Sequence, residues 1–279
     1  MNKKVQKLGL GTVQFGIPYG ISNKKGQTSS AEVTEILKIA EKNKVRVIDT
    51  ASAYGNAEKV LGRNDLSPFK LISKFMPPDE NRSMTHQFKQ SLQDLQVRSL
   101  YGYLAHRAKH LAGNLSIWGE LEALKEKGLV KKIGFSLNEP YELEILLKKN
   151  IRPDIIQAPF NYFDRRFKDL MISLKEQGCE IHSRSAFLQG LFFMDLDQLD
   201  SYFVELIPLI ENLQKNVENL PGALLKFVLE QPFIDRVIIG VENRRQFIQN
   251  LDSISTLSSL PELTKEIPES ILIPSNWPS

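Results

Sequence analysis

Short apolar runs alternate with amphipathic stretches along almost the whole chain. The β-branched run at residues 45–49 is typical of a buried parallel strand, whereas the spacing of Val33, Ile36 and Leu37 within residues 31–43 is helical. The pattern predicts strands at residues 8–12, 45–49, 69–74, 100–105, 130–136, 154–158, 180–185 and 236–239. It predicts helices at residues 31–43, 57–63, 84–95, 116–127, 140–149, 167–177, 202–214, 222–230 and 244–252.

Eight strands with helices between them are the pattern of a (β/α)8 TIM barrel. An open, doubly wound α/β sheet is the competing architecture. The chain shows no linker of domain scale, which favours a closed barrel forming a single domain over residues 1–279. A long excursion follows the seventh strand, at residues 186–220, and an irregular tail that we expect to lie over the surface begins at about residue 261. In such a barrel the site lies at the C-terminal ends of the strands.

Composition and charge narrow the range of partners. The chain has 279 residues, 42% of them hydrophobic and 25% charged, with a formal net charge of +3. Charges of both signs are mixed along the chain, so we expect no nucleic-acid groove and no membrane surface patch. No apolar run approaches the roughly 20 residues of a membrane span or follows the N-terminus as a signal peptide. Cys179 is the one cysteine, which excludes an internal disulfide and a thiolate-rich metal site. We expect a cytoplasmic protein, and no sequence feature indicates its oligomeric state.

Polar side chains stand at the ends of three neighbouring predicted strands. These are Asp49, Lys74 and His106, and Tyr54 lies in the loop beyond Asp49. Because parallel strands end at one mouth of the barrel, we expect the four to converge there. Each residue also has a purely structural interpretation. Asp49 would cap the next helix or form an ion pair with Lys74, and Tyr54 and His106 would pack at the rim of the barrel.

The four groups together suit one chemistry. A phenol has a pKa near 10, and a nearby ammonium lowers that value by stabilising the phenolate. A carboxylate holds the ammonium in place, and a histidine orients a substrate oxygen. The set suits protonation of a carbonyl oxygen while its carbon receives a hydride, which only a cofactor supplies. We assign no role to His86, His110 and His182, and we expect no metal site.

Nine segments spread over nearly the whole chain match one protein family. They are Leu8-Gly9-Leu10-Gly11-Thr12; Asp49-Thr50-Ala51 with Tyr54-Gly55 and Glu58; Leu61-Gly62; Lys74; Leu104-Ala105-His106-Arg107; Lys132-Ile133-Gly134-Phe135-Ser136; Gln157 with Asn161; Gln189-Gly190-Leu191; and Ile239-Gly240 to Asn250-Leu251. On these residues the chain resembles the aldo/keto reductases, here a bacterial member. The resemblance implies a catalytic tetrad of Asp49, Tyr54, Lys74 and His106, with Tyr54 as the general acid. It also implies an NADP cofactor, with NADPH expected and NADH as the alternative, and a small aldehyde, ketone or sugar as substrate.

The resemblance further implies cofactor contacts around the mouth of the barrel. Gly11 and Thr12 would lie near the nicotinamide, Ser136 and Gln157 at its carboxamide, and residues 185–190 around the pyrophosphate. The last helix would hold the adenosine end. The full set of expected contacts is Gly11, Thr12, Asp49, Ser136, Gln157, Arg184, Ser185, Phe187, Gln189, Gly190, Gly240, Arg244, Gln246, Gln249 and Asn250.

The sequence departs from the family pattern at three places. Leu137 follows Ser136 where many members have asparagine, and Arg184 stands where an aromatic ring usually stacks on the nicotinamide. A guanidinium plane can stack as well. Glu242 would disfavour a 2′-phosphate on the adenosine ribose, whereas Arg244 and Arg245 would favour one.

Two other functions remain open from the residues alone. A Schiff-base enzyme would use Lys74 as nucleophile, which requires a lysine of lowered pKa. A non-catalytic nucleotide sensor or partner subunit would not need an intact tetrad. Loops set the substrate in this fold, so the sequence does not name it. We expect apolar pocket walls from Phe15, Tyr19, Phe75, Met76, Phe160, Tyr162 and Phe163.

Overall fold

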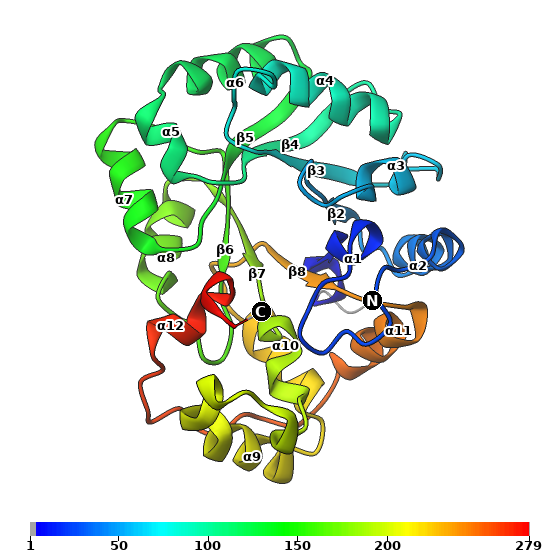
Figure 1. Ribbon diagram of the computed structural model, residues 1–279, viewed down its shortest axis with the longest axis vertical. Helices are drawn as coiled ribbons and strands as arrows, with labels where there is room; N and C mark the ends of the chain where they lie inside the picture. Colours follow the sequence, from blue (N-terminus) through cyan, green and yellow to red (C-terminus); the bar gives the residue numbers. More distant parts are fainter. Residues whose placement is uncertain (1–3, 279) are drawn as a thin grey trace.

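Eight parallel strands close into a barrel in the order β1 to β8 in the computed structural model, which describes residues 4–278 (Figure 1). The strands are β1 (Leu8–Gly11), β2 (Val47–Asp49), β3 (Lys70–Phe75), β4 (Leu100–Ala105), β5 (Val130–Ser136), β6 (Ile155–Pro159), β7 (Glu180–Arg184) and β8 (Arg236–Gly240). The sequence prediction of a closed eight-stranded barrel is confirmed, and the open sheet is excluded because β8 pairs with β1.

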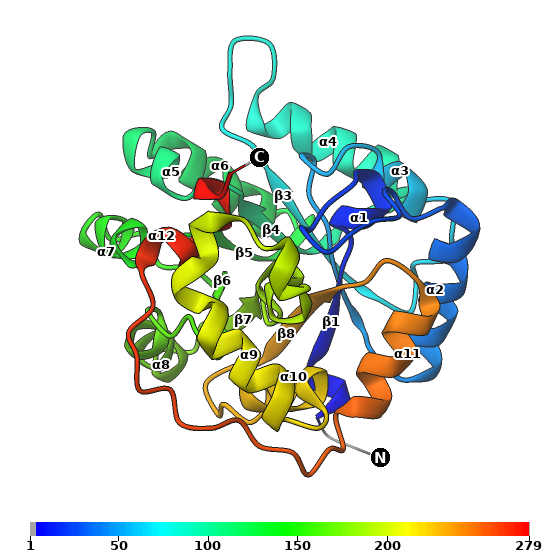
Figure 2. The same cartoon turned by 60° about the horizontal axis from the view of Figure 1, so that its bottom comes forward.

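Helices surround the barrel on its outer side (Figures 1 and 2). The α-helices are α1 (Val13–Gly16), α2 (Ser30–Lys42), α3 (Ala57–Leu61), α4 (Met84–Leu95), α5 (Lys109–Gly113), α6 (Ser116–Glu126), α7 (Pro140–Lys148), α8 (Lys168–Glu176), α9 (Ile207–Asn216), α10 (Leu220–Leu229), α11 (Arg244–Ser253) and α12 (Glu269–Leu272). The short helices α1, α5 and α12 were not predicted, because four or five residues show too little of the helical period. The helix α2 is capped by Ser29, whose side chain accepts a hydrogen bond from the backbone N–H of Glu32.

Strand register brings the predicted site residues to one end of the barrel. Gly11 lies opposite Asp49 on one side and opposite Gly240 on the other, and Ser136 lies opposite Gln157. All five stand at or near the C-terminal ends of their strands. Because the strands are parallel, these residues form one rim, which is the mouth of the barrel.

The barrel interior and its outer surface have separate apolar layers. Val47, Ile72, Leu104, Ile155 and Ile238 fill the interior as one buried cluster. A larger cluster packs the outer face of the strands against the surrounding helices. Strands that are buried on both faces need apolar residues at nearly every position, which explains why they appear as continuous apolar runs in the sequence.

The excursion between β7 and β8 forms a second core with the C-terminal tail. It contains the 3-10 helices η2 (Leu188–Phe193), η3 (Leu196–Gln198) and η4 (Ser201–Leu206), followed by α9 and α10. Two hydrogen bonds and one ring contact fix the tail: Tyr162 Oη donates to the carbonyl of Pro261, Tyr202 Oη donates to that of Ser270, and Trp277 packs edge-on against Phe203. Figure 2 shows the tail running around the molecule and returning to the side of α9. No helix within residues 4–278 has both the length and the apolar character needed to cross a bilayer.

Candidate active site

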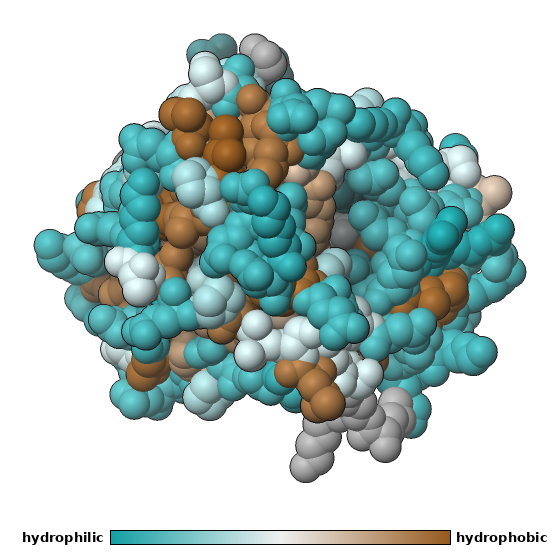
Figure 3. Space-filling model, turned by 90° about the horizontal axis from the view of Figure 1, so that it is seen from below, coloured by the Kyte–Doolittle hydropathy of each residue, from teal (hydrophilic) through white to brown (hydrophobic). Residues whose placement is uncertain are grey.

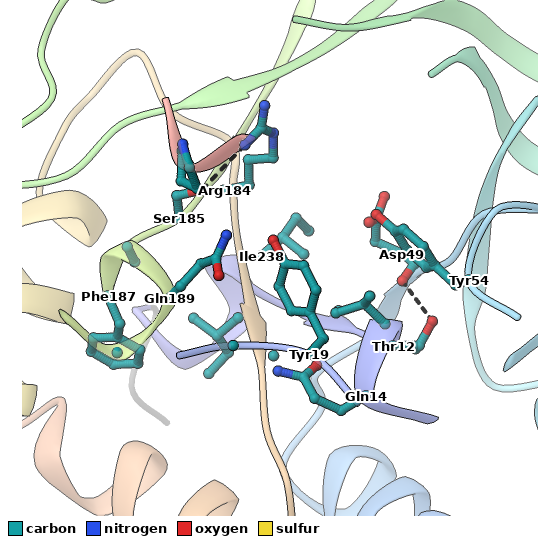
Figure 4. A pocket seen from close by; sticks show the side chains of 18 of the residues that line it. Thr12, Gln14, Tyr19, Asp49, Tyr54, Arg184, Ser185, Phe187, Gln189 and Ile238 are labelled. Carbon is teal, nitrogen blue, oxygen red and sulfur yellow. Dashed lines mark hydrogen bonds between the residues drawn. The ribbon is translucent and has the colours of Figure 1, made fainter. Parts of the chain in front are cut away.

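A pocket of about 490 Å³ opens at the C-terminal mouth of the barrel. Figure 3 shows a hollow on this face, with apolar surface along one side and polar surface along the other. The pocket walls come from the strand ends, the β1–α2 loop, the segment after β7 and the C-terminal tail. Asp49, Tyr54 and His106 line this pocket, and Figure 4 shows Asp49 and Tyr54 side by side in its wall.

Asp49 and Lys74 form a buried ion pair below the pocket floor. Lys74 Nζ lies 2.6 Å from Asp49 Oδ2, and neither side chain is more than 4% exposed. Gln157 Nε2 donates to the other carboxylate oxygen at 2.8 Å, and the Asp49 backbone carbonyl accepts from Thr12 Oγ1. Burial alone would lower the pKa of the Lys74 ammonium, but Asp49 and Tyr54 outweigh burial and raise that pKa. Lys74 is therefore a fixed cation, because its counter-charge is buried with it.

Tyr54 enters the pocket from the turn after β2. Lys74 Nζ donates to Tyr54 Oη at 3.4 Å and lies 5.1 Å from the centre of the phenol ring. The turn packs tightly against α1, where a methyl group on Gly16 would overlap the Tyr54 carbonyl oxygen. Gly55 has φ of +56°, a left-handed conformation that favours glycine. These two glycines let α1 and the turn approach closely enough to set the position of the phenol.

His106 follows β4 and meets Tyr54 edge-on. The two ring centres are 5.5 Å apart, with 81° between the ring planes. Burial, with the nearby charges of Lys74, Arg184 and Arg107, lowers the pKa of His106 to about 3. The imidazole is therefore neutral at physiological pH and carries a single N–H. Its Nδ1 is buried and has no hydrogen-bond partner within the described part of the chain.

Most of the expected cofactor contacts line this pocket, and three do not. The residues that line it are Gly11, Thr12, Asp49, Ser136, Gln157, Arg184, Ser185, Phe187, Gln189, Gly190, Gly240 and Gln246. Arg244, Gln249 and Asn250 lie on α11 outside the pocket wall. Arg244 is engaged by Glu32, which accepts from its backbone N–H at 2.6 Å and lies 3.9 Å from its side-chain Nε.

The pocket has features that fit an elongated polar cofactor. Strands β1 and β8 end in Gly11 and Gly240, which leave an opening that side chains would fill; a Cβ on Gly240 would lie 2.7 Å from Gln14 Oε1. That Gln14 oxygen is buried and has no partner within residues 4–278. A buried amide oxygen without a partner is unfavourable, so a donor from a bound group would stabilise it. Gln14 was missed in the sequence because a glutamine after a glycine-rich strand carries no distinctive signal.

The C-terminal tail contributes wall residues that the sequence did not indicate. Ile273, Pro274 and Ser275 line the pocket, a role that was not predicted for the tail. Of the aromatic residues expected as walls, Tyr19 lines the pocket, while Phe15, Phe75 and Phe160 are buried in the core. The walls instead include Phe187 and Phe193 of the excursion together with the tail, and contacts between such distant segments leave no local signal in the sequence.

The segment after β3 and the histidines outside the tetrad do not contribute to the pocket. His86 lies on α4, His110 on α5 and His182 inside β7. No group of three or more His, Cys, Asp or Glu side chains within residues 4–278 is placed to hold a metal ion. Cys179 is buried at the start of β7, and burial raises its pKa to about 12.

Comparison with known proteins identifies sequence relatives. A sequence model described as the aldo/keto reductase family matches residues 7–265. A glyoxal reductase of Bacillus subtilis (strain 168) is 33% identical over 172 residues, which cover 57% of this chain and 59% of that protein. The chain thus matches somewhat under two thirds of that relative's length.

Solved structures share the fold at lower sequence identity. The holo form of an aldo-keto reductase from Bacillus halodurans has a TM-score of 0.74 at 19% identity, covering 91% of this chain and 88% of that chain. An aldo-keto reductase from Klebsiella pneumoniae in complex with NADPH has a TM-score of 0.66 at 18% identity, covering 91% of this chain and 87% of that chain.

Proposed function

The chain belongs to the aldo/keto reductase family, and from this premise we propose that it reduces an aldehyde, ketone or sugar carbonyl to an alcohol with NADPH. One observation carries the proposal. The Lys74 ammonium, held by the buried Asp49 carboxylate, lies within hydrogen-bond distance of a phenol at the floor of the pocket. Ordinary structural ion pairs do not need a tyrosine hydroxyl directed into a cavity.

Tyr54 is the proposed general acid. Its O–H donates a proton to the carbonyl oxygen as the carbonyl carbon becomes tetrahedral, and the oxygen leaves as the alcohol hydroxyl. The phenolate that forms is stabilised by Lys74 at 3.4 Å. Asp49 keeps that ammonium oriented toward Tyr54 rather than toward solvent. Before the next turnover the phenolate regains a proton from solvent, which restores the acid.

His106 is the proposed guide for the carbonyl oxygen. Because its ring is neutral, it can donate one hydrogen bond without competing as a proton source. The edge-on contact with Tyr54 brings the imidazole and the phenol to the same side of the pocket. A carbonyl oxygen bound between them would accept from both, which orients it for protonation.

NADPH, when bound, supplies the hydride that forms the new C–H bond, so that the carbonyl compound, NADPH and one proton give the alcohol and NADP⁺. We propose that Ser136 and Gln157 hold the carboxamide, with Gln14 as a further hydrogen-bond acceptor near the strand ends. Arg245 is exposed and makes no ion pair within the described residues, so it is our candidate for the 2′-phosphate, while Arg244 is engaged by Glu32. The NADPH complex of the Klebsiella pneumoniae protein supports NADPH as the cofactor, and the activity named for the Bacillus subtilis relative supports a carbonyl compound as the substrate.

The other two functions have less support. A Schiff-base enzyme needs a neutral lysine, whereas Asp49 and Tyr54 raise the pKa of Lys74. A sensor without chemistry would not require the buried charge pair, which is unfavourable to desolvate unless both partners are present.

The test has two steps. Pure protein is titrated with NADPH and with NADH, and binding is measured by intrinsic fluorescence. Turnover of 4-nitrobenzaldehyde is then measured. The proposal expects tighter binding of NADPH than of NADH and oxidation of NADPH that depends on the aldehyde. Binding of neither nucleotide would contradict it. Covalent trapping of an aldehyde on Lys74 by borohydride would instead support the Schiff-base enzyme.

A further inference from the structure

The charged side chains that line the pocket include more positive groups than negative groups placed to neutralise them. Its ionisable lining, phenols apart, consists of Asp49, His106, Arg107, Arg184 and Glu242. The Asp49 charge is neutralised by Lys74, and His106 is neutral. At the end of the pocket where Tyr54 stands, two guanidinium groups therefore remain without a negative partner.

Glu242 does not provide that partner. It follows β8, where its carbonyl accepts from Thr28 Oγ1 and its N–H donates to Gln246 of α11. Arg184 instead extends from β7 across β6 to the loop after β5, away from β8. Within the described residues no carboxylate lies within ion-pair distance of Arg184 or Arg107.

Arg184 is fixed in place by neutral acceptors. Its Nη2 donates to the carbonyl of Leu137 at 2.8 Å and to Asn138 Oδ1, and its Nη1 donates to Ser185 Oγ at 3.2 Å. A guanidinium has five N–H donors, so these three bonds leave two that no protein acceptor takes. The side chain is half-buried, and Figure 4 shows it on the pocket wall across from Tyr19 and Tyr54. It is a preorganised cation with unused donors.

Arg107 brings a second positive charge to the same region. It directly follows His106, its side chain is exposed, and no hydrogen bond or ion pair holds it within residues 4–278. Both arginines are close enough to His106 to act on its pKa, after burial and Lys74. Both arginines thus line the same pocket as Tyr54 and His106, and only Arg184 is held in place by hydrogen bonds.

We propose that the carbonyl substrate carries an anionic group, a carboxylate or a phosphate, and that Arg184 binds it while Arg107 attracts it to the mouth. This proposal rests on the reductase function proposed above. A guanidinium forms its strongest hydrogen bonds with carboxylate and phosphate oxygens, and a cleft lined by one sign of charge concentrates ligands of the opposite sign. The pyrophosphate of the nucleotide is the other source of the same chemistry, and the experiment separates the two.

The substrate arm compares 4-carboxybenzaldehyde with its neutral amide analogue, 4-carbamoylbenzaldehyde. The proposal expects kcat/KM for the carboxylate to be higher by roughly tenfold or more, a preference that weakens at high salt. Arg184→Gln should remove most of the preference, measured as the ratio of kcat/KM for the carboxylate to kcat/KM for the amide, and Arg107→Gln should remove part of it. Arg98→Gln is the matched control, because Arg98 is an exposed arginine just before the start of β4, at the other end of the barrel. Equal kcat/KM values for the two aldehydes in the wild type would overturn the proposal.

The cofactor arm measures the Kd of NADPH in the same variants. Arg184 is also an expected neighbour of the nicotinamide, so the ratio between the two aldehydes is measured at saturating NADPH, where a change in cofactor affinity does not affect it. A loss of NADPH affinity with an unchanged preference between the aldehydes would assign Arg184 to the pyrophosphate and overturn the proposal.

A binding arm distinguishes failure of this proposal from failure of the reductase function. Calorimetric titration with benzoate and benzamide, with and without NADP⁺, needs no turnover. Tighter binding of benzoate that is lost in Arg184→Gln would support the anion site even if neither aldehyde were reduced. Equal binding of benzoate and benzamide, with both aldehydes reduced alike, would overturn the anion site and leave the reductase function standing.

Discussion

Lys74 Nζ and Asp49 Oδ2 are 2.6 Å apart at a point where the lysine side chain is fully buried and the aspartate nearly so. The pair joins the neighbouring strands β2 and β3, and Asp49 lines the pocket. Two buried charges of this kind stabilise a fold poorly compared with apolar residues of the same volume. Their position next to the Tyr54 hydroxyl allows the Lys74 ammonium to stabilise the phenolate form of Tyr54.

Lys74→Met should remove both the charge behind Tyr54 and the partner of Asp49. We expect kcat/KM to fall by about a hundredfold or more, since the phenolate loses its stabilising cation. We also expect the free energy of unfolding to fall by about 3–5 kcal/mol, because an unpaired carboxylate is left buried. Steady-state kinetics and urea unfolding measure the two effects. Lys89→Met, at an exposed position of α4, is the control, and equal effects in both variants would contradict the prediction.

Gly16→Ala tests whether α1 sets the position of the general acid. The added methyl group would overlap the Tyr54 carbonyl, so the turn must move. We expect about 1–3 kcal/mol of lost stability and a larger relative loss in kcat than in NADPH affinity. Gly119→Ala in α6 is the matched control, because nothing lies within 4 Å of a Cβ there. An unchanged kcat in Gly16→Ala would show that the turn tolerates displacement.

The pH dependence of turnover should carry no inflection from His106 near neutrality. Burial and the cations around it lower its pKa to about 3, below the usual value near 6.5, so the ring stays neutral from pH 6 to 8. The folded protein binds this proton more weakly than the unfolded chain does. The stability contributed by neutral His106 is therefore complete above about pH 6.5 and is lost as the pH falls toward 3. A kcat/KM profile with an inflection near pH 6.5 that disappears in His106→Gln would refute this assignment.

Glu180 should link stability to pH at the opposite end of the barrel. Its carboxylate accepts from Tyr101 Oη at 2.6 Å, pairs with Lys132 at 2.7 Å and lies 2.8 Å from His182 Nε2. Burial would raise the pKa of this carboxyl, but the hydrogen bonds outweigh burial and hold that pKa well below its usual range. The stability it contributes is present above the unfolded-state pKa of about 4.3 and is lost as the pH falls below that value.

Urea unfolding of Glu180→Gln from pH 7 to pH 3 measures this link. We expect a deficit of about 3 kcal/mol at pH 7 that shrinks below pH 4.5, because only the wild type gains a proton there on unfolding. Glu126→Gln, on the exposed face of α6, should show no such trend. A deficit that stays constant down to pH 3 would show that the carboxylate contributes packing rather than charge.

The sequence was sufficient for the parts of the structure that depend on local patterns. The alternation of apolar runs and amphipathic stretches predicted every strand, because a strand buried on both faces is a short continuous apolar run and the helices between the strands show a helical period. Asp49, Lys74 and His106 could be identified because burying a charged or polar side chain at the end of an apolar strand is unfavourable unless that side chain is paired or hydrogen-bonded.

The parts that were missed depend on contacts between distant segments. Ile273 reaches the pocket because Tyr162, Tyr202 and Trp277 fix the tail, and none of these contacts is visible in the local sequence. Arg107 was quoted only as part of a matching segment, since its lack of a negative partner is a property of the folded mouth. Phe75 was expected in the pocket and instead packs in the core against Tyr103.

A single-turnover experiment with Tyr54→Phe tests the central claim most directly. Enzyme loaded with NADPH is mixed with 4-nitrobenzaldehyde, and the loss of NADPH absorbance is followed in the wild type, in Tyr54→Phe and in the exposed control Tyr141→Phe. The account predicts that Tyr54→Phe binds NADPH as the wild type does but oxidises it about a hundredfold to ten-thousandfold more slowly, while Tyr141→Phe is unchanged. Oxidation of NADPH at the wild-type rate by Tyr54→Phe would contradict the assignment of Tyr54 as the general acid.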